Sequence, residues 1–288
     1  MSLRKILLSV FSIGVVAVVA VYATQAFFSD EEKSVGNTFV AGAIDLKISN
    51  TSYGFDWNRP GEDNPTGGVW GQNSTSSWTS RDLNTCGPDE NLPCLFFSFD
   101  DLKPGDYGED TIDIVVQDND AWACMAFDLN GTPENGIVDP ESEAGDVAGD
   151  PNDGELQNYL NFAFWLDDGD NVYEGNEGDL LFSGLASELD GKWQAIAELG
   201  DPVLVGGQMY YVGKFWCFGT LTPAPVAQSD YVAPTAANTG FTCSGVGDQN
   251  DAQTDGIVVD VSFYAVQSRN NQSFVCSSLP TPTPGGGG

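Results

Sequence analysis

Apolar and polar residues alternate along many short stretches of the chain, which is the period of a strand with one buried face. Near the C-terminus this alternation places Val259, Val261 and Phe263 on one face. The same pattern predicts further strands at 39–48, 94–99, 111–117, 121–129, 160–166 and 208–219. Only 184–199 has the spacing of a helix, and only for a few turns. The pattern therefore predicts an all-β protein with at most one short helix.

Stretches rich in Gly, Pro, Asn and Asp separate these strands and predict long loops, at 51–93, 131–156 and 221–255. Pro104 and Gly105 suit the two central positions of a type II turn, because Pro fixes φ and Gly accepts a positive φ. Antiparallel strands joined by irregular loops are typical of a sandwich. We predict a jelly-roll-like antiparallel β-sandwich with long loops.

The first 26 residues have the parts of an export signal. Arg4 and Lys5 precede an apolar run over 6–22, and the small-x-small triplet 24–26 ends at Ala26. We expect cleavage after Ala26, so that the membrane is contacted only before cleavage. The alternative is an uncleaved anchor, since a run of nearly ~20 apolar residues can span a bilayer. The expected divisions are a signal peptide at 1–26, an extended segment at 27–38, the sandwich at 39–278 and a disordered Pro/Thr/Gly tail at 279–288.

Six cysteines follow the signal, which are Cys86, Cys94, Cys124, Cys217, Cys243 and Cys276. An even number of cysteines in an exported chain predicts three disulfides. The short loop from Cys86 to Cys94 is the expected pair, and the other pairings stay open. We expect a secreted, extracellular protein at the cell surface.

The chain is strongly acidic, with a formal net charge of -32. Removal of Arg4 and Lys5 with the signal leaves 8 basic against 42 acidic residues, so the net charge becomes -34. Nucleic acid is excluded as a partner, because phosphate binding needs a basic surface. Such a surface keeps the protein soluble and suits divalent cations.

One acidic stretch, 165–179, is the densest candidate for a metal site. Its oxygen ligands at close spacing on a Gly-punctuated loop are the donors that Ca²⁺ selects. The candidate ligands are Asp167, Asp168, Asp170, Asn171, Glu174 and Glu177. The spacing is only similar to that of an EF-hand loop, and the alternative is a solvated acidic turn between two strands. A second acidic stretch, 139–155, is less regular, and we interpret it as a solvated loop.

Several aromatic residues could form exposed platforms for a carbohydrate, but their alternation favours a place in the core of a sandwich. These residues are Phe162, Phe164, Trp165, Tyr210, Tyr211, Phe215 and Trp216. A carbohydrate-binding role stays a minor alternative.

Three stretches together resemble the TasA/camelysin family of exported proteins with SipW-type signal peptides. They are the opening TQAFFSDEEKSVGNTFVAGAIDLKI, the central FDDLKPGDYGEDTIDIVVQDNDAWACMAF and the closing VDVSFYAVQSRNN, about a third of the chain. The resemblance implies a jelly-roll subunit of biofilm matrix fibres or surface filaments, whose partners are copies of itself in a head-to-tail homopolymer and other matrix or envelope components.

The family resemblance also implies a role for the extended segment after Ala26. In such fibres the N-terminal segment of one subunit completes the sheet of its neighbour, with apolar residues entering pockets. Phe27, Phe28 and Phe39 would then be the strand-donation residues. The alternative is that this segment pairs within its own domain, which would make the protein a monomeric cell-surface adhesin or a carbohydrate- or ligand-binding module of the same fold.

Camelysin-like members have been classed as metallopeptidases, yet an enzyme is not expected here. The chain contains no histidine, so the zinc motif H-E-x-x-H and a Ser-His-Asp triad are both absent. A glycosidase would need two carboxylates, and no pair is singled out among so many.

Overall fold

The structure is a computed structural model, and it describes residues 29–34, 37–39, 46–56, 69–72, 77–81, 95–97, 102–117, 119–147, 149–227, 233–247 and 249–282. Its strands are β1 (Ser29–Ser34), β2 (Asn37–Phe39), β3 (Leu46–Asp56), β4 (Val69–Gln72), β5 (Trp78–Arg81), β6 (Tyr107–Val116), β7 (Ala121–Gly131), β8 (Leu160–Asp167), β9 (Phe182–Leu185), β10 (Lys192–Ala197), β11 (Met209–Phe218), β12 (Thr220–Pro223), β13 (Phe241–Ser244) and β14 (Val258–Gln267).

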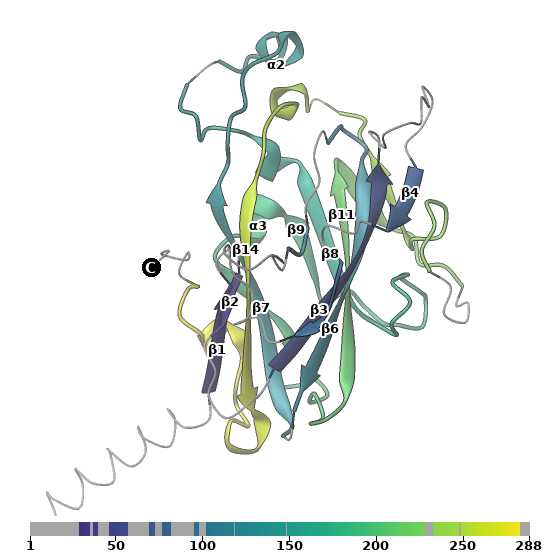
Figure 1. The fold of residues 1–288 in the computed structure, drawn as a ribbon, viewed down its shortest axis with the longest axis vertical. Coiled ribbons are helices and arrows are strands. Elements are labelled where there is room, and N and C mark those ends of the chain that lie inside the picture. Colours follow the sequence, from purple (N-terminus) through teal and green to yellow (C-terminus); the bar gives the residue numbers. More distant parts are fainter. Residues whose placement is uncertain are drawn as a thin grey trace, which may run out of the picture.

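The strands form antiparallel sheets (Figure 1). One sheet has five strands in the order β10-β7-β14-β1-β2. The larger sheet has seven, in the order β4-β3-β6-β11-β8-β9 with β5 paired to β3, and β12 pairs with β13 as a separate hairpin. The described residues contain two short α-helices, α2 (Asp139–Ala144) and α3 (Ala186–Leu189), where the sequence predicted at most one. Short 3-10 helices occur at Leu156–Asn158, Asn250–Ala252, Ser268–Asn270 and Cys276–Ser278.

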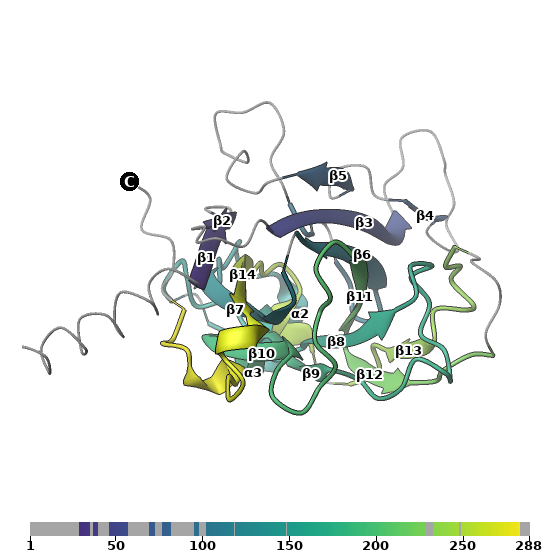
Figure 2. The same cartoon turned by 90° about the horizontal axis from the view of Figure 1, so that it is seen from below.

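The five-stranded and seven-stranded sheets face each other (Figure 2), and their inner faces form the main core. Ile112 and Phe164 reach into this core from the larger sheet, and Met125 and Phe263 reach into it from the other. The prediction of an all-β sandwich is therefore confirmed. Its physical basis is the alternation along each strand, which puts one apolar face toward the opposite sheet.

A second, smaller core lies on the opposite face of β8 and β11. Trp165 and Phe215 pack there against Phe241 of β13, with ring centroids 5.2 Å and 4.7 Å from it. Gly213 of β11 makes room for this packing, because a Cβ atom there would lie 2.2 Å from the Trp165 ring. Burial on both faces explains why the sequences of β8 and β11 are apolar almost throughout. It also confirms that most of the aromatic residues belong to the core.

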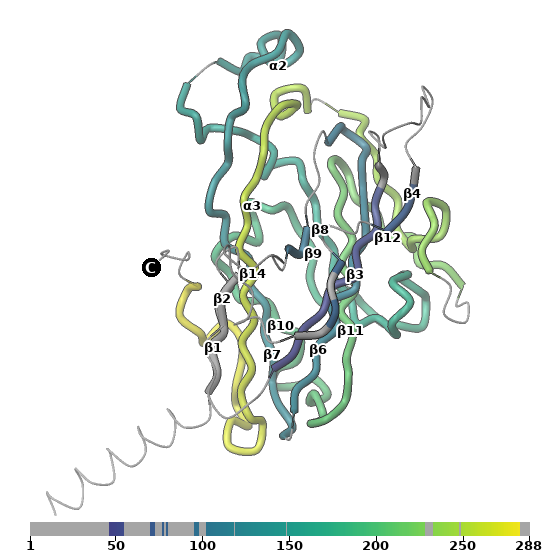
Figure 3. The backbone as a smooth tube through the Cα atoms, in the orientation of Figure 1, coloured from purple at the N-terminus to yellow at the C-terminus, as the bar shows by residue number. Residues whose placement is uncertain are grey.

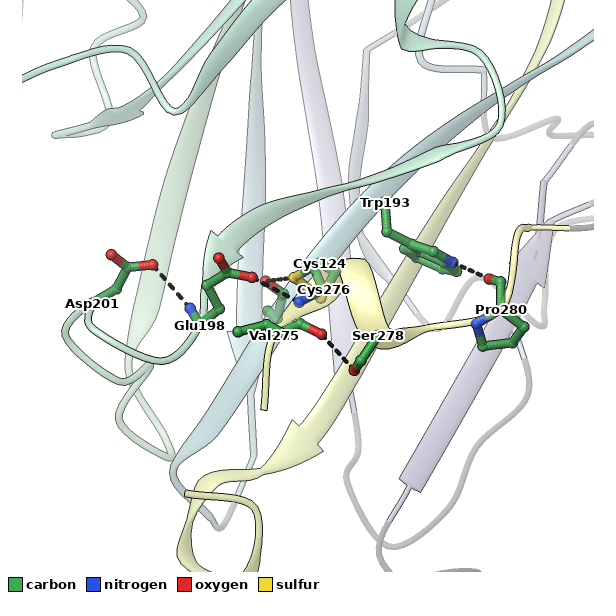
Figure 4. The surroundings of a disulfide bond; sticks show 9 residues. Cys124, Trp193, Glu198, Asp201, Val275, Cys276, Ser278 and Pro280 are labelled. Atoms are coloured by element: carbon green, nitrogen blue, oxygen red, sulfur yellow. Dashed lines mark hydrogen bonds between the residues drawn. A yellow bond between two sulfur atoms is a disulfide. The ribbon is translucent and has the colours of Figure 1, made fainter. Parts of the chain in front are cut away.

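Two disulfides are present among the described residues, Cys124–Cys276 and Cys217–Cys243. The first joins β7 to the segment after β14 (Figure 4). Around it, Glu198 accepts a hydrogen bond from the backbone N–H of Cys276 (2.7 Å), and the Trp193 indole donates one to the carbonyl of Pro280 (2.8 Å). These contacts hold the start of the predicted tail on the sheet, and 283–288 lie outside the described residues. The expected pair of Cys86 with Cys94 also lies outside them.

β1 extends the five-stranded sheet next to β14, although the two strands come from opposite ends of the chain (Figure 1). The pairing is antiparallel and runs from Ser29 opposite Val266 to Glu32 opposite Phe263. β2 pairs with β1 on its other side and forms the edge. Phe27 and Phe28 lie outside the described residues, and Phe39 is the last residue of β2.

Four sequence predictions of local structure are wrong. The predicted loop at 221–255 contains most of β12 and all of β13. Residues 95–97 are not in a strand, although Phe96 is buried. The predicted helix at 184–199 is only the four residues of α3, followed by β10, because β10 pairs with β7. The loop predicted at 51–93 is partly strand. β3 continues to Asp56, and β4 and β5 also lie within this range.

The predicted turn at Pro104 and Gly105 is present. Gly105 has φ 98°, and the N–H of Asp106 donates to the carbonyl of Lys103 at 2.9 Å. This turn leads into β6, which runs between β3 and β11 (Figure 3). No helix in the described part of the chain is long and apolar enough to cross a membrane, and the predicted signal at 1–26 lies outside that part.

Candidate metal centre

The acidic loop connects two antiparallel neighbours of the larger sheet. β8 ends at Asp167, and the chain returns as β9 after residue 181, with Phe164 opposite Phe182. The site is therefore a hairpin loop between strands and not the helix–loop–helix of an EF-hand. Gly169 (φ 110°), Asn171 (φ 67°) and Gly178 (φ 88°) give the loop its reversals, because all three have left-handed backbone conformations.

Carboxylates of the loop shape it by accepting backbone hydrogen bonds. Asp167 Oδ2 accepts from the N–H groups of Gly169 (3.0 Å) and Asn171 (3.1 Å). Glu177 spans the loop, since its Oε1 accepts from Asp168 N–H (3.0 Å) and its Oε2 from Glu174 N–H (2.8 Å). The carboxylates of Asp167 and Glu177 therefore point toward the backbone of the loop, and the bonds of Asp167 resemble those of an Asx turn.

The loop is attached to the second core through Tyr173. Its hydroxyl donates to the carbonyl of Gly178 at 2.8 Å, and its ring packs 5.1 Å from that of Phe241. Its backbone N–H donates to Thr239 O (3.1 Å), and its carbonyl accepts from Val226 N–H (3.1 Å). The loop is thus held by tertiary contacts and not only by its own turns.

Five of the six predicted ligands come together in two overlapping groups. Asp167, Asp168 and Glu177 form one group, and Asp168, Asp170 and Glu174 form the other, with ligand oxygens in each group within 4.8 Å of one another. These acidic groups could hold a metal ion. Asp168 belongs to both groups, so the two describe one continuous cluster of carboxylates.

Burial distinguishes this cluster from a solvated turn. Asp167 is 9% exposed, Asp170 7% and Glu174 0%. The sixth predicted ligand, Asn171, is 2% exposed, and neither atom of its side-chain amide has a hydrogen-bond partner among the described residues. Oδ1 of Asp167 likewise makes no hydrogen bond there. Buried oxygens without a partner are costly, and a cation would satisfy them.

The electrostatics of the loop also favour bound positive charge. Burial raises the pKa of Asp167 to about 7, and the charges of Asp170 and Asp168 add to this while its backbone hydrogen bonds oppose it. Burial likewise raises the pKa of Glu177 to about 8, with Asp167 and Glu174 adding to it. Without a cation, part of the cluster therefore holds protons near neutral pH.

Glu109 is a buried carboxyl beside the loop that the sequence analysis missed. It lies on β6, is 0% exposed, and neither carboxyl oxygen has a hydrogen-bond partner in the described residues. Burial first, and then the charges of Asp167, Asp110 and Asp170, raise its pKa well above the ordinary value. Glu109 is in neither ligand group, but it adds to the negative potential. The available signal was the acidic pair Glu109 and Asp110, directly before the predicted strand at 111–117.

The loop also forms one wall of a pocket of about 290 Å³ on the outer face of the larger sheet. Asp170 and Asn171 line it from the loop, and Tyr53, Thr111 and Tyr211 line it from the strands. The lining is mostly polar, with hydroxyl groups and carboxylates at the same opening.

A second acidic cluster joins residues that are far apart in the sequence. Glu134, Glu155 and Asp255 bring ligand oxygens within 4.8 Å of one another. Burial and the charge of Asp255 raise the pKa of Glu155 to about 7. Glu141 of α2 is 0% exposed, and it accepts hydrogen bonds from Val138 N–H (2.7 Å) and Thr254 N–H (2.8 Å). The interpretation of 139–155 as a solvated loop is therefore wrong at Glu141.

A comparison with protein-family models finds no match for the chain, and a comparison with curated proteins finds none either.

Proposed function

We propose that the chain is a secreted structural subunit of an extracellular fibre or biofilm matrix, which assembles head to tail with copies of itself. In this proposal the N-terminal segment 27–38 of one copy fills the sheet edge beside β14 of the next. The observation that supports it is the position of β1, which pairs with β14 and comes from the chain end that export would free.

Strand exchange at this edge should cost little free energy. The contacts of β1 with β14 include a backbone ladder, and a backbone ladder is the same whether the strand comes from its own chain or from a neighbour. Exchange therefore conserves the hydrogen bonds of the closed monomer, as in domain swapping. Because the donor and the acceptor are different surfaces, the contact is heterologous, and it produces an open filament when the rotation between successive subunits does not close a ring.

Calcium is the cation that we propose for the acidic loop. The donors are hard oxygens at close spacing, and Ca²⁺ takes six to eight such ligands at about 2.3–2.6 Å. The loop lies at the β12–β13 end of the sandwich, opposite β1 and β2 (Figure 2). Calcium would therefore stabilise the subunit rather than form the contact between subunits. The two disulfides are compatible with an extracellular location.

The alternative function is a monomeric adhesin or ligand-binding module, and the polar pocket beside the acidic loop favours it. Tyr53 and Tyr211 line that pocket together with hydroxyl and carboxylate groups. Such groups suit a carbohydrate or another polar ligand. Neither role requires catalysis, and the absence of histidine from the sequence agrees with a protein that is not an enzyme.

Cysteine cross-linking between β1 and β14 separates the two functions. Glu31 lies opposite Tyr264 in the register of these strands. One preparation carries Glu31→Cys, a second carries Tyr264→Cys, and the two are mixed under conditions that give filaments in electron micrographs. Strand exchange predicts disulfide-linked dimers in the mixture, whereas either preparation alone gives no such specific dimer.

A protein with both substitutions completes the test. Strand exchange predicts a ladder of linked multimers, and removal of 27–39 should abolish filaments while circular dichroism shows a folded domain. If the double variant links only within single chains, and mixing gives no dimer, the fibre proposal is wrong and the monomeric alternative stands. For calcium, a melting temperature that is the same in EDTA and in excess Ca²⁺ would remove the metal proposal.

A further inference from the structure

A cluster of polar side chains lies in the main core, between the two sheets and away from the acidic loop. Lys214 of β11 is 1% exposed, and Asp110 of β6 and Asn50 of β3 are each 0% exposed. The three strands are neighbours in the larger sheet (Figures 1 and 2). Lys214 is opposite Asp110 in the register, and Asn50 is opposite Ile112, two residues farther along the same face. An amine, a carboxyl and an amide therefore meet in a water-excluded place.

The distances place the carboxyl group of Asp110 in contact with both the amine and the amide. Nζ of Lys214 is 2.9 Å from Oδ2 of Asp110, and Nδ2 of Asn50 is 3.4 Å from Oδ1 of the same carboxyl. Both nitrogens also donate to the carbonyl oxygen of Phe96, each at 3.2 Å. The Phe97 ring covers the amine, with its centroid 4.4 Å from Nζ. The carboxyl thus bridges the amine and the amide, and the segment 95–97 closes the cluster.

Burial changes the chemistry of the amine and the carboxyl. Burial lowers the pKa of Lys214 while Asp110 opposes this, and burial raises the pKa of Asp110 while Lys214 opposes it. Transfer of one proton from Nζ to the carboxylate gives a neutral amine beside a carboxylic acid, which avoids two buried charges. A neutral, desolvated lysine is a nucleophile, and a carboxylic acid beside the amide nitrogen can protonate that nitrogen as a leaving group.

We propose that Lys214 and Asn50 form an intramolecular isopeptide bond, with Asp110 as the acid–base group. The lone pair of Nζ attacks Cγ of Asn50, and the new C–N bond forms a tetrahedral intermediate. Asp110 accepts one proton from Nζ and gives one to Nδ2, and the Cγ–Nδ2 bond then breaks. Ammonia leaves, Asp110 is regenerated, and no oxidant or reductant is needed. The product is a secondary amide that joins β3 to β11 across β6.

This inference is independent of the fibre proposal, because it concerns the core of a single subunit. A bond of this kind would remain after reduction of both described disulfides, and it would restrict the unfolded chain over a long loop. The ordinary interpretation of the same cluster is a structural ion pair with an amide neighbour. The two differ in covalent composition, which makes the choice between them a measurement of mass.

Peptide mapping of the folded, unmodified protein by mass spectrometry tests the proposal. The protein is reduced, alkylated and digested with trypsin, which does not cleave at an acylated lysine. The expected product is a branched peptide that joins the peptide of Asn50 to that of Lys214, lighter by one ammonia than the two together. Fragmentation should place the branch at these two residues.

Two results would overturn the proposal. Recovery of only unbranched peptides would show that the cluster is an ion pair, and a branched peptide lighter by one water would make Asp110 the acyl donor instead. Asp110→Asn, checked by circular dichroism for a folded protein, should lose the ammonia-deficient peptide because the acid–base group is gone. Persistence of that peptide in a folded Asp110→Asn protein would overturn the role of Asp110, and the map of the unmodified protein decides the bond itself.

Discussion

Replacement of Asp167 by asparagine should stabilise the protein near neutral pH when no metal ion is bound, although it removes a charge from the candidate metal centre. An asparagine keeps an oxygen that can accept the N–H groups of Gly169 and Asn171, but it does not titrate. In the unfolded chain the pKa of Asp167 is the ordinary 3.8, and in the folded protein it is raised to about 7. The raised pKa disfavours the charged form in the folded state by about 4 kcal/mol.

The sign of the pH dependence follows from where the proton is bound. Between these two pKa values the folded protein holds a proton that the unfolded chain has lost, so stability falls as pH rises. The contribution of Asp167 is complete below the unfolded pKa and is lost as pH rises through the folded pKa. From about pH 5 to about pH 7 this amounts to about 2.5 kcal/mol. The raised pKa of Glu177 adds a loss of the same sign.

Urea denaturation in the presence of a chelator, followed by tryptophan fluorescence at several pH values, measures this effect. The Asp167→Asn protein should show a flatter pH dependence than the unmodified protein and should be the more stable of the two at about pH 7.5. If the loop binds Ca²⁺ as proposed, excess Ca²⁺ should close or reverse that gap. A ligand at 100 times its Kd stabilises a protein by about 2.7 kcal/mol, and the variant lacks one of the proposed calcium ligands. Asp179→Asn, which removes a charge at an exposed position of the same loop, is the matched control. Parallel pH curves for Asp167→Asn and the unmodified protein would refute the reasoning.

Two further predictions concern the stability of the sandwich, measured by urea denaturation. Gly213→Ala should destabilise the protein by about 1–3 kcal/mol, since the new Cβ would meet the Trp165 ring at 2.2 Å. Gly71→Ala is the control and should be close to neutral, because a Cβ at Gly71 would have no atom within 4 Å. Equal effects of the two substitutions would contradict the packing argument. Removal of the Cys124–Cys276 disulfide, with a sequence separation of 152, should cost about 5 kcal/mol, against about 3.5 kcal/mol for Cys217–Cys243 with a separation of 26. The reverse order would show that chain entropy does not decide their contributions.

The prediction of strands succeeded where alternation was long and failed where an apolar run was short. The pattern of 94–99 predicts a strand. In the structure, however, the carbonyl of Phe96 accepts hydrogen bonds from the side chains of Asn50 and Lys214 and not from the backbone of a neighbouring strand. The pattern of 184–199 predicts a helix, but the second half of this stretch forms strand β10 because it pairs with β7. In both cases a partner distant in the sequence overrode the local preference.

The ligands of the candidate site could be partly predicted from the sequence, because its carboxylates are close together along the chain. Five of the six predicted ligands form its overlapping groups, since one hairpin loop carries them all. The burial of the loop could not be predicted from the sequence. It depends on the packing of Tyr173 against Phe241 and on backbone hydrogen bonds to Val226 and Thr239. Glu109 was missed for the same reason, because β6 brings it to the loop from far away in the chain.

The sequence by itself determined the all-β class, the acidic character and the place of the calcium candidate, because each depends on local pattern and composition. Only the tertiary structure decided that β1 lies beside β14, which cysteines among the described residues pair, and that Lys214 meets Asp110 and Asn50. The physical reason is that sheet order and register are set by the packing of whole faces against each other. A lysine in an apolar strand indicates that some partner is buried with it, but only the neighbouring strands decide which one.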